Sequence, residues 1–244
     1  SKRQFDRRNA QVADLKGRLL KYYDDSLKNF QKEHNLYNIH LMGQHVNYKQ
    51  RYRTKQARFW ASSYEDKRPE LTNAQRKMLS HYDNATLYND SIVAQIVKRF
   101  QKQDAIVIYV PDHGEECYEE NRGFICRNHS AEIDWPLAHY EFEIPFWIYC
   151  SPKYIRNHRD IYRQIRKAKD KRFMTDALPH LLLYLAGIET PTYKEEYNIL
   201  SPKYDEMRPR ILKNSADYDK LRDAHLEKIK KEESKKVIKK ERRN

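Results

Sequence analysis

The spacing of apolar and polar residues along the chain predicts several helices. Apolar side chains recur every three or four residues over 12–31 and over 73–100, as they do in a helix that buries one face. A charged helix is expected over 160–171, and a more apolar one over 176–186. The helix over 73–100 is the longest of these, with Asn73 as its predicted N-cap.

Short apolar runs between the helices predict strands. Residues 105–110 are unbroken and rich in Ile and Val, which is typical of a strand buried on both faces. Further strands are expected over 35–42 and over 142–149, where Pro145 indicates a sheet edge or a bulge. Because strands alternate with helices, the sequence predicts an α/β fold with a mostly parallel sheet.

The end of the chain differs from the rest in composition. Residues 226–244 contain nine Lys/Arg and four Asp/Glu, a net charge of +5, with too few apolar residues to form a core. We therefore divide the chain into one large domain over 1–219 and a basic charged tail over 220–244. The net charge of the whole chain is +13, and the remaining +8 is spread over residues 1–225.

Bulk properties narrow the classes of function. A basic chain suits nucleic acid, anionic lipid or a phosphorylated substrate. No zinc-finger pattern or RNA-binding aromatic signature is present, so nucleic acid is the least favoured partner. No apolar run approaches the roughly 20 residues that a membrane-spanning helix requires. The chain also opens directly into charged sequence, without the apolar core of a signal peptide.

The strand predicted over 105–110 ends in a group of residues that can bind a metal. Asp112 and His113 offer a carboxylate oxygen and an imidazole nitrogen, which together suit zinc and, less well, manganese. Adjacent side chains point to opposite faces of a regular strand, so the two can share one ion only in irregular backbone. Pro111 and Gly114 provide such backbone. The alternative is a polar loop in which Asp112 caps a helix.

Four stretches in the same order resemble the lipid A phosphoethanolamine transferases of the alkaline phosphatase superfamily. They are NIHLMGQHVNYKQRY (38–52), HYDNATLYNDSIV (81–93), IVIYVPDHGEE (106–116) and TDALPHLLLYLAGI (175–188), the last of which also resembles the closing helix of sulfatases. The resemblance implies an alkaline-phosphatase-like α/β/α sandwich, represented by its carboxyl-terminal portion.

The resemblance also implies roles for individual residues. Asp112 and His113 would hold one or two zinc ions, and Glu115 would hydrogen-bond a ligand histidine or bind a second metal. His45 and His129 would bind the transferred phosphoryl group. Each role has an alternative, because Glu115 could cap a turn and either histidine could be a solvated surface residue.

Two of these positions depart from the family pattern. Gln44 stands before His45 where the family has Ser, which leaves the histidine itself in place. Ser130 follows His129 where the family usually has Gly, and the loop that holds His129 is longer. The assignment of His129 therefore depends on position more than on local sequence.

The implied reaction is the transfer of phosphoethanolamine from a phospholipid donor to lipid A or a related glycan. It would take place at the surface of the bacterial inner membrane, with the catalytic domain in the periplasm. In the family a threonine nucleophile lies well before the segment that matches 38–52, and none of residues 1–37 resembles its surroundings. We therefore expect the carboxyl-terminal part of a longer enzyme, inactive by itself.

Other functions remain open at this stage. A sulfatase or a phosphoglycerol transferase would share the fold and the metal motif. A non-catalytic basic module that docks lipid or a partner would need no zinc, so the zinc content separates the two classes. Cys117 and Cys126 flank a short loop after the metal motif and could form a disulfide or remain free thiols, and Cys150 is a third cysteine.

Overall fold

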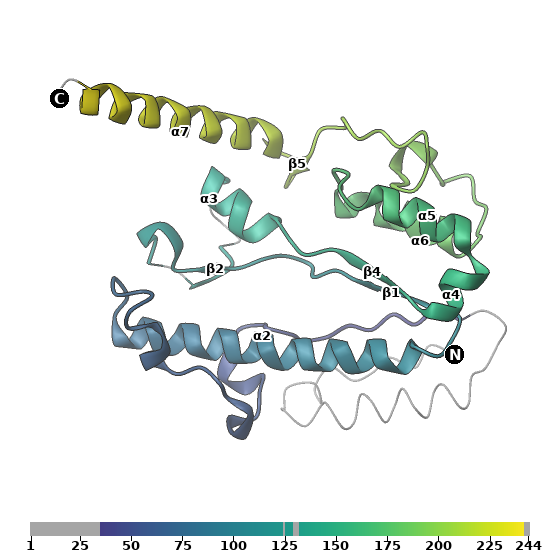
Figure 1. The fold of residues 1–244 in the computed structure, drawn as a ribbon, viewed down its shortest axis with the longest axis horizontal. Helices are drawn as coiled ribbons and strands as arrows, with labels where there is room; N and C mark the ends of the chain where they lie inside the picture. The colour runs from purple at the N-terminus through teal and green to yellow at the C-terminus, as the bar shows by residue number, and fades with distance from the viewer. Residues whose placement is uncertain (1–34, 124, 129–131, 242–244) are drawn as a thin grey trace. The chain divides into compact units, whose positions relative to one another are not determined.

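The chain divides into two compact units. The computed structural model describes residues 35–123, 125–128 and 132–241. Unit 1 contains the described residues up to 101 together with 117–126, and unit 2 contains 102–116 and the described residues from 127 onward. Figure 1 shows the elements of both units in chain order. The helix predicted over 12–31 lies outside the described residues.

Unit 1 is built on the long helix α2 (Asn73–Phe100), which has the predicted bounds. The N-cap is Thr72 instead of Asn73, because the Thr72 hydroxyl accepts the backbone N–H of Gln75 and the Gln75 side chain accepts that of Thr72. The turns η2 (Tyr48–Gln50), η3 (Thr54–Gln56) and η4 (Ala61–Tyr64) precede the helix, and η2 and η4 contact it.

The buried amide of Asn84 joins α2 to the loop before it. Its oxygen accepts the backbone N–H groups of Arg58 and Phe59 at 2.6 and 3.1 Å, and its nitrogen donates to the Phe59 and Ser80 carbonyls at 2.8 and 2.7 Å. Both N–H donors and both acceptor positions of the amide are thereby used, which identifies Asn84 as a structural residue.

A short hairpin belongs to unit 1 from Cys117 onward. Strands β2 (Glu116–Cys117) and β3 (Ile125–Cys126) pair across the turn η5 (Glu119–Asn121), and both hairpin cysteines are free thiols. Residues 35–42, predicted as a strand, form none in the structure. Their apolar side chains do not alternate strictly, and Tyr37 packs its ring 5.9 Å from that of Phe100 on α2.

Unit 2 contains the strand pair β1 (Ile106–Tyr109) and β4 (Trp147–Cys150). β1 confirms the strand predicted over 105–110, although its residues are half-buried and not enclosed on both faces. The two strands are antiparallel, with Val107 opposite Tyr149, and the hairpin over 211–217 is antiparallel too. The parallel pairing expected of this fold class is therefore not seen between the described strands whose register is known.

The segment before β4 is helical up to Phe142, which is the first residue of the predicted strand over 142–149. α3 (Trp135–Leu137) starts with the side chain of Asp134 accepting the Leu137 N–H at 2.9 Å. It continues directly into the π-helical turn η6 (Ala138–Phe142). β4 therefore begins at Trp147, five residues later than the predicted strand.

After β4, several helices surround the main core of unit 2. α4 (Pro152–Asn157) and α5 (Arg159–Ala168) are followed by η7 (Thr175–Ala177) and α6 (Leu178–Leu185), which confirms the two helices predicted in this region. The core cluster contains Ala168, Leu181, Ile199 and Leu200, with Ile148, Ile161 and Ile165 packed against it.

The chain ends in a long helix that is attached to unit 2 at its beginning. After η8 (Glu195–Tyr197), the antiparallel hairpin β5 (Ile211–Leu212) and β6 (Ala216–Asp217) leads into α7 (Tyr218–Glu241). The ring of Trp135 stacks on His225 of α7, with centroids 5.2 Å apart. Across the described ranges, no helix is long and apolar enough to span a membrane.

Candidate metal-binding site

The turn after β1 carries Asp112 and His113, the two residues that sequence analysis singled out as metal ligands. The backbone leaves the ladder at Tyr109, and Pro111 cannot donate a ladder hydrogen bond. The Asp112 side chain is 89% exposed and the His113 side chain is 23% exposed. One donor is therefore open to solvent, whereas the other is largely held by the protein.

The imidazole of His113 is oriented by the backbone carbonyl of the next residue, Gly114. Its Nδ1 lies 2.6 Å from the carbonyl oxygen of Gly114, so Nδ1 carries the proton and donates it. The lone pair is then on Nε2, which lies 3.8 Å from Oδ2 of Asp112. A histidine that donates one ring N–H to a carbonyl and presents the other nitrogen is typical of metal ligands in proteins.

The distance between these two donors fits a shared zinc ion. Oxygen and nitrogen ligands lie about 2.0–2.2 Å from zinc in a tetrahedral arrangement, so two of them are roughly 3.4 Å apart. The 3.8 Å separation is slightly longer, and a small rotation of the exposed Asp112 side chain would bring its carboxylate to that distance. Among the described residues, no cluster of three or more His, Cys, Asp or Glu could hold a metal. The candidate site in the described parts of the chain therefore consists of one pair of possible ligands.

Gly114 holds this turn against the π-helical turn η6. Its N–H donates to the Glu141 carbonyl at 2.8 Å. A Cβ at position 114 would lie 2.2 Å from the Tyr140 carbonyl oxygen, closer than any side chain permits. Gly114 was predicted from the sequence to supply backbone freedom. The structure requires glycine there for another reason, because the backbone at Gly114 lies against the backbone of Tyr140.

Sequence analysis missed Glu141, which connects two segments of the candidate site. Its side chain is 1% exposed, and its Oε1 accepts the backbone N–H of Asn128 at 2.6 Å. Its Oε2 is buried without a hydrogen-bond partner among the described residues. Asp134 followed by Pro136 is a helix-start signal that could have revealed the turn on which Glu141 lies.

The other predicted site residues lie elsewhere or outside the described residues. Glu115 follows the turn and is half-buried. His45 belongs to unit 1, where it is exposed and where Arg51 donates to its carbonyl at 2.8 Å. His129 lies outside the described residues. The structure thus brings together Asp112 and His113 and describes His45 in a separate unit.

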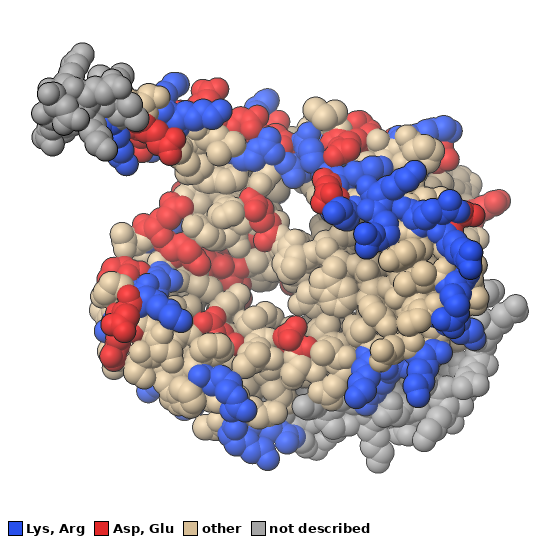
Figure 2. Space-filling model, viewed as in Figure 1, with Lys and Arg blue, Asp and Glu red and all other residues tan. Residues whose placement is uncertain are grey.

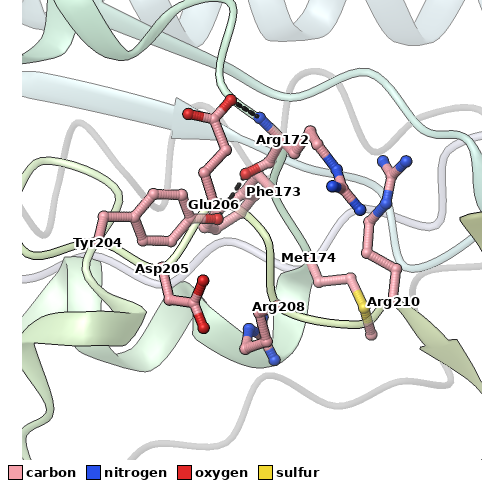
Figure 3. A pocket seen from close by; sticks show the side chains of 8 residues that line it. All are labelled: Arg172, Phe173, Met174, Tyr204, Asp205, Glu206, Arg208 and Arg210. Atoms are coloured by element: carbon pink, nitrogen blue, oxygen red, sulfur yellow. Dashed lines mark hydrogen bonds between the residues drawn. The ribbon is translucent and has the colours of Figure 1, made fainter.

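A second polar pocket lies in unit 2, but its charged groups already have partners. Figure 3 shows the arginine side chains on one side of the pocket and the Tyr204 hydroxyl directed at the Arg172 carbonyl, 2.5 Å away. Arg208 donates two hydrogen bonds to the carboxylate of Asp176. Arg172 and Arg210 each donate a hydrogen bond to the carboxylate of Asp219. The space is about 10 Å³, roughly that of one water molecule. This pocket is a structural network and not a ligand site.

Most of the chain is matched by the model of a protein family. The model of the sulfatase family matches residues 3–188, and the chain belongs to that family.

Within it the chain is similar to phosphoethanolamine transferases. It is 31% identical over 192 residues to phosphoethanolamine transferase EptC of Escherichia coli strain K12. That match covers 75% of this chain and 32% of that protein. It is 31% identical over 137 residues to Kdo(2)-lipid A phosphoethanolamine 7''-transferase of the same strain, 55% of this chain and 23% of that protein. The chain thus spans about a third of the length of the EptC proteins that it matches.

Solved structures confirm the predicted fold class. The crystal structure of the C-terminal periplasmic domain of EptC from Escherichia coli in complex with Zn has a TM-score of 0.70 at 27% identity. The match covers 90% of this chain and 60% of that domain. The corresponding domain of EptC from Campylobacter jejuni shows the same fold, with a TM-score of 0.60 at 22% identity. That match covers 78% of this chain and 59% of the Campylobacter domain. The chain therefore corresponds to part of an alkaline-phosphatase-like domain.

Proposed function

We propose that this chain is part of a zinc-dependent enzyme that transfers phosphoethanolamine from a phospholipid to lipid A or a related glycan. The observation that carries the proposal is the pair Asp112 and His113, whose donor atoms are 3.8 Å apart in a turn that orients the imidazole. Support comes from the similar transferases and from the zinc complex of the E. coli EptC domain. We propose the bacterial periplasm, at the inner membrane, as the place of reaction.

The residues of this chain have separate roles in the proposal. Asp112 and His113 hold zinc, and Gly114 fixes the imidazole through its carbonyl. His45 and His129 bind the transferred phosphoryl group, and Glu115 supports a ligand or a second ion. When bound, zinc would polarise the phosphoryl group and stabilise the charge that develops on its oxygens.

By itself the 244-residue chain is proposed to have no turnover. Transfer through a covalent intermediate requires a nucleophile, and none of residues 1–37 resembles the threonine segment of the family. Loss of a nucleophile commonly lowers the rate by several orders of magnitude. The assay is transfer from a fluorescent phosphatidylethanolamine analogue with zinc added. Zinc-dependent product from the purified chain would contradict this part of the proposal.

Zinc binding tests the site independently of turnover. We expect Asp112→Ala to weaken zinc affinity at least about tenfold, because it removes one of two ligands. Asp66→Ala is the matched control, since Asp66 is also an exposed aspartate but lies in unit 1. Isothermal titration with zinc measures both variants. Equal affinities for Asp112→Ala and the unaltered chain would remove Asp112 from the site.

A sulfatase or a phosphoglycerol transferase is the second candidate, favoured by the match of the sulfatase family model. Both would use the same metal ligands. In a longer protein that includes this chain, hydrolysis of a sulfate ester without phosphoethanolamine transfer would select the sulfatase. Transfer of glycerol phosphate would select the phosphoglycerol transferase.

A further inference from the structure

The positive charge of the chain is concentrated in two segments of unit 2. Residues 153–172 contain nine Lys/Arg and two Asp/Glu, a net charge of +7, and the tail over 226–244 carries +5. The other 205 residues together carry only +1 of the total of +13. The charge outside the tail is therefore not spread over the chain, as sequence analysis assumed, but lies mostly on α4, α5 and the residues after them.

The structure turns the basic residues of α5 outward. Ile161, Ile165 and Ala168 recur at helical spacing and pack into the core cluster around Leu181. The opposite face is exposed, and the exposed basic residues of α4, α5 and the next turn are Lys153, Arg156, Arg159, Arg163, Arg166, Lys167 and Lys169. Figure 2 shows Lys and Arg side chains gathered over α4 and α5 on the face in view. Because the helix is packed on a core, these charges are held in one surface.

Most of this charge is not neutralised within the protein. Arg163 pairs with Asp160, and Lys169 pairs with Asp170 at 3.5 Å. Lys153, Arg156, Arg159, Arg166 and Lys167 have no ion-pair partner in the described parts of the chain. Like charges held side by side repel one another, so this arrangement is favourable when an anionic partner covers them.

The tail is a weaker candidate for the same role. Over 226–236 the helix α7 has five lysines and three glutamates, a net charge of +2, and Lys231 lies 3.7 Å from Glu227. The exposed charges of α7 are thus interleaved in sign, whereas those of α4 and α5 are almost all positive. Charge density and packing both favour α4 and α5.

We propose that the exposed basic face of α4 and α5 docks this unit on an anionic phospholipid surface. The inference deepens the proposed function, on which it rests only for the presence of a membrane near the protein. The face is separated from the candidate metal site along the strand pair. The end of β4 pairs with the start of β1, and α4 follows that end of β4. Asp112 follows the other end of β1. Docking would hold the unit on the lipid without covering the metal ligands.

Vesicle binding tests the inference with two matched variants of the whole chain. The first is Arg159→Gln/Arg166→Gln/Lys167→Gln, and the second is Lys228→Gln/Lys231→Gln/Lys235→Gln on α7. Both lose three positive charges from exposed positions. Sedimentation is measured with vesicles of phosphatidylcholine, with and without phosphatidylglycerol, at low and at physiological salt. Thermal unfolding checks that both variants fold.

The two variants are expected to differ at low salt. One basic residue at an anionic surface contributes about fivefold to binding, so the α5 variant should bind roughly 100-fold more weakly. The affinity of the α7 variant for the vesicles should fall at most about tenfold, because neighbouring glutamates already reduce the local charge of α7. Physiological salt should reduce both effects through screening. Arg159→Lys/Arg166→Lys should bind like the unaltered chain, since it retains the charge.

Three results would overturn the inference. Equal weakening in the two triple variants would mean that only net charge matters. Unchanged binding of the α5 variant would exclude this face. Tighter binding of the α5 face to a random duplex DNA than to the anionic vesicles would assign it to nucleic acid. None of the measurements requires zinc or turnover, so failure of the proposed enzymatic function would leave these results interpretable.

Discussion

The helices α5 and α7 are both rich in basic residues, but they differ in how they pack against the rest of the unit. α5 buries Ile161, Ile165 and Ala168 against the core, so only one of its faces is basic. α7 has no comparable apolar face, because every residue from 226 to 236 is exposed, including Leu226 and Ile229. The comparison shows that a count of basic residues does not define a surface, whereas the packing of the helix does.

The start of α7 is attached by polar and aromatic contacts. The Tyr218 hydroxyl donates to Glu143 at 2.5 Å, and the Arg210 guanidinium lies over the Tyr218 ring. Burial and the neighbouring carboxylate raise the pKa of Tyr218 to about 12. Asp219 accepts from Arg172 and Arg210. α7 thus depends on this network, whereas α5 depends on hydrophobic packing.

The largest effect is expected from the core under α5. Leu181 is completely buried in the cluster that receives the apolar face of α5. Leu181→Ala should lower the free energy of unfolding by about 2–5 kcal/mol, because it removes buried apolar groups and leaves a cavity. Urea denaturation measures the change, and Leu182→Ala is the control, since Leu182 is exposed. Equal losses for the two variants would contradict the assignment of the core.

A smaller effect is expected at the attachment of α7. Asp219→Asn keeps the shape of the side chain but removes its charge, and Arg172 and Arg210 lose a charged acceptor. The free energy of unfolding should fall by about 1.5–3 kcal/mol at neutral pH. Asp223→Asn is the control, because Asp223 is exposed and pairs only with Arg222 among the described residues.

The same variant should change the pH dependence of stability. The hydrogen bond from Arg210 lowers the pKa of Asp219 below its ordinary value of 3.8 in the folded protein. The contribution of the carboxylate is therefore complete above about pH 4 and is lost as the pH falls through the lower pKa of the folded state. The difference between the unaltered chain and Asp219→Asn should shrink below about pH 4. A difference that is constant with pH would contradict the charge network.

The smallest effect is expected from the tail itself. Deletion of residues 226–244 leaves the stacked pair of Trp135 and His225 in place and removes a segment whose described side chains are mostly exposed. The free energy of unfolding should change by no more than ~0.5 kcal/mol, as for surface residues in general. Thermal unfolding of the shortened chain is the measurement. A loss similar to that of Asp219→Asn would show that the tail contributes to the fold.

Regular local patterns made several elements predictable from the sequence. The bounds of α2 follow from an apolar period that continues through its buried residues Leu79, Ile92 and Phe100. β1 follows from a run of β-branched residues that Pro111 ends. The pairing of Asp112 with His113 follows from their position in the turn after β1. In each case the information lies within a few consecutive residues.

Features that depend on distant contacts were not predictable in this way. The attachment of α7 joins Trp135 to His225, which lie far apart in the sequence. Glu141 is buried, with Asn128 donating to its Oε1 and Gly114 to its backbone carbonyl, and no local pattern marks a buried glutamate. Residues 35–42 were predicted as a strand from composition, although no partner strand pairs with them in the described structure.

The π-helical turn η6 limits how this part of the chain can change in length. Backbone hydrogen bonds in a π-helical turn join residues five apart, whereas those in an α-helix join residues four apart. The turn Ala138–Phe142 therefore contains one additional residue. Deletion of one residue there would convert it into an α-helical turn and change the direction of the residues that follow. The Glu141 carbonyl would then turn away from Gly114, and the Asp112–His113 turn would lose its support. Over evolutionary time this segment should accept substitutions much more readily than insertions or deletions.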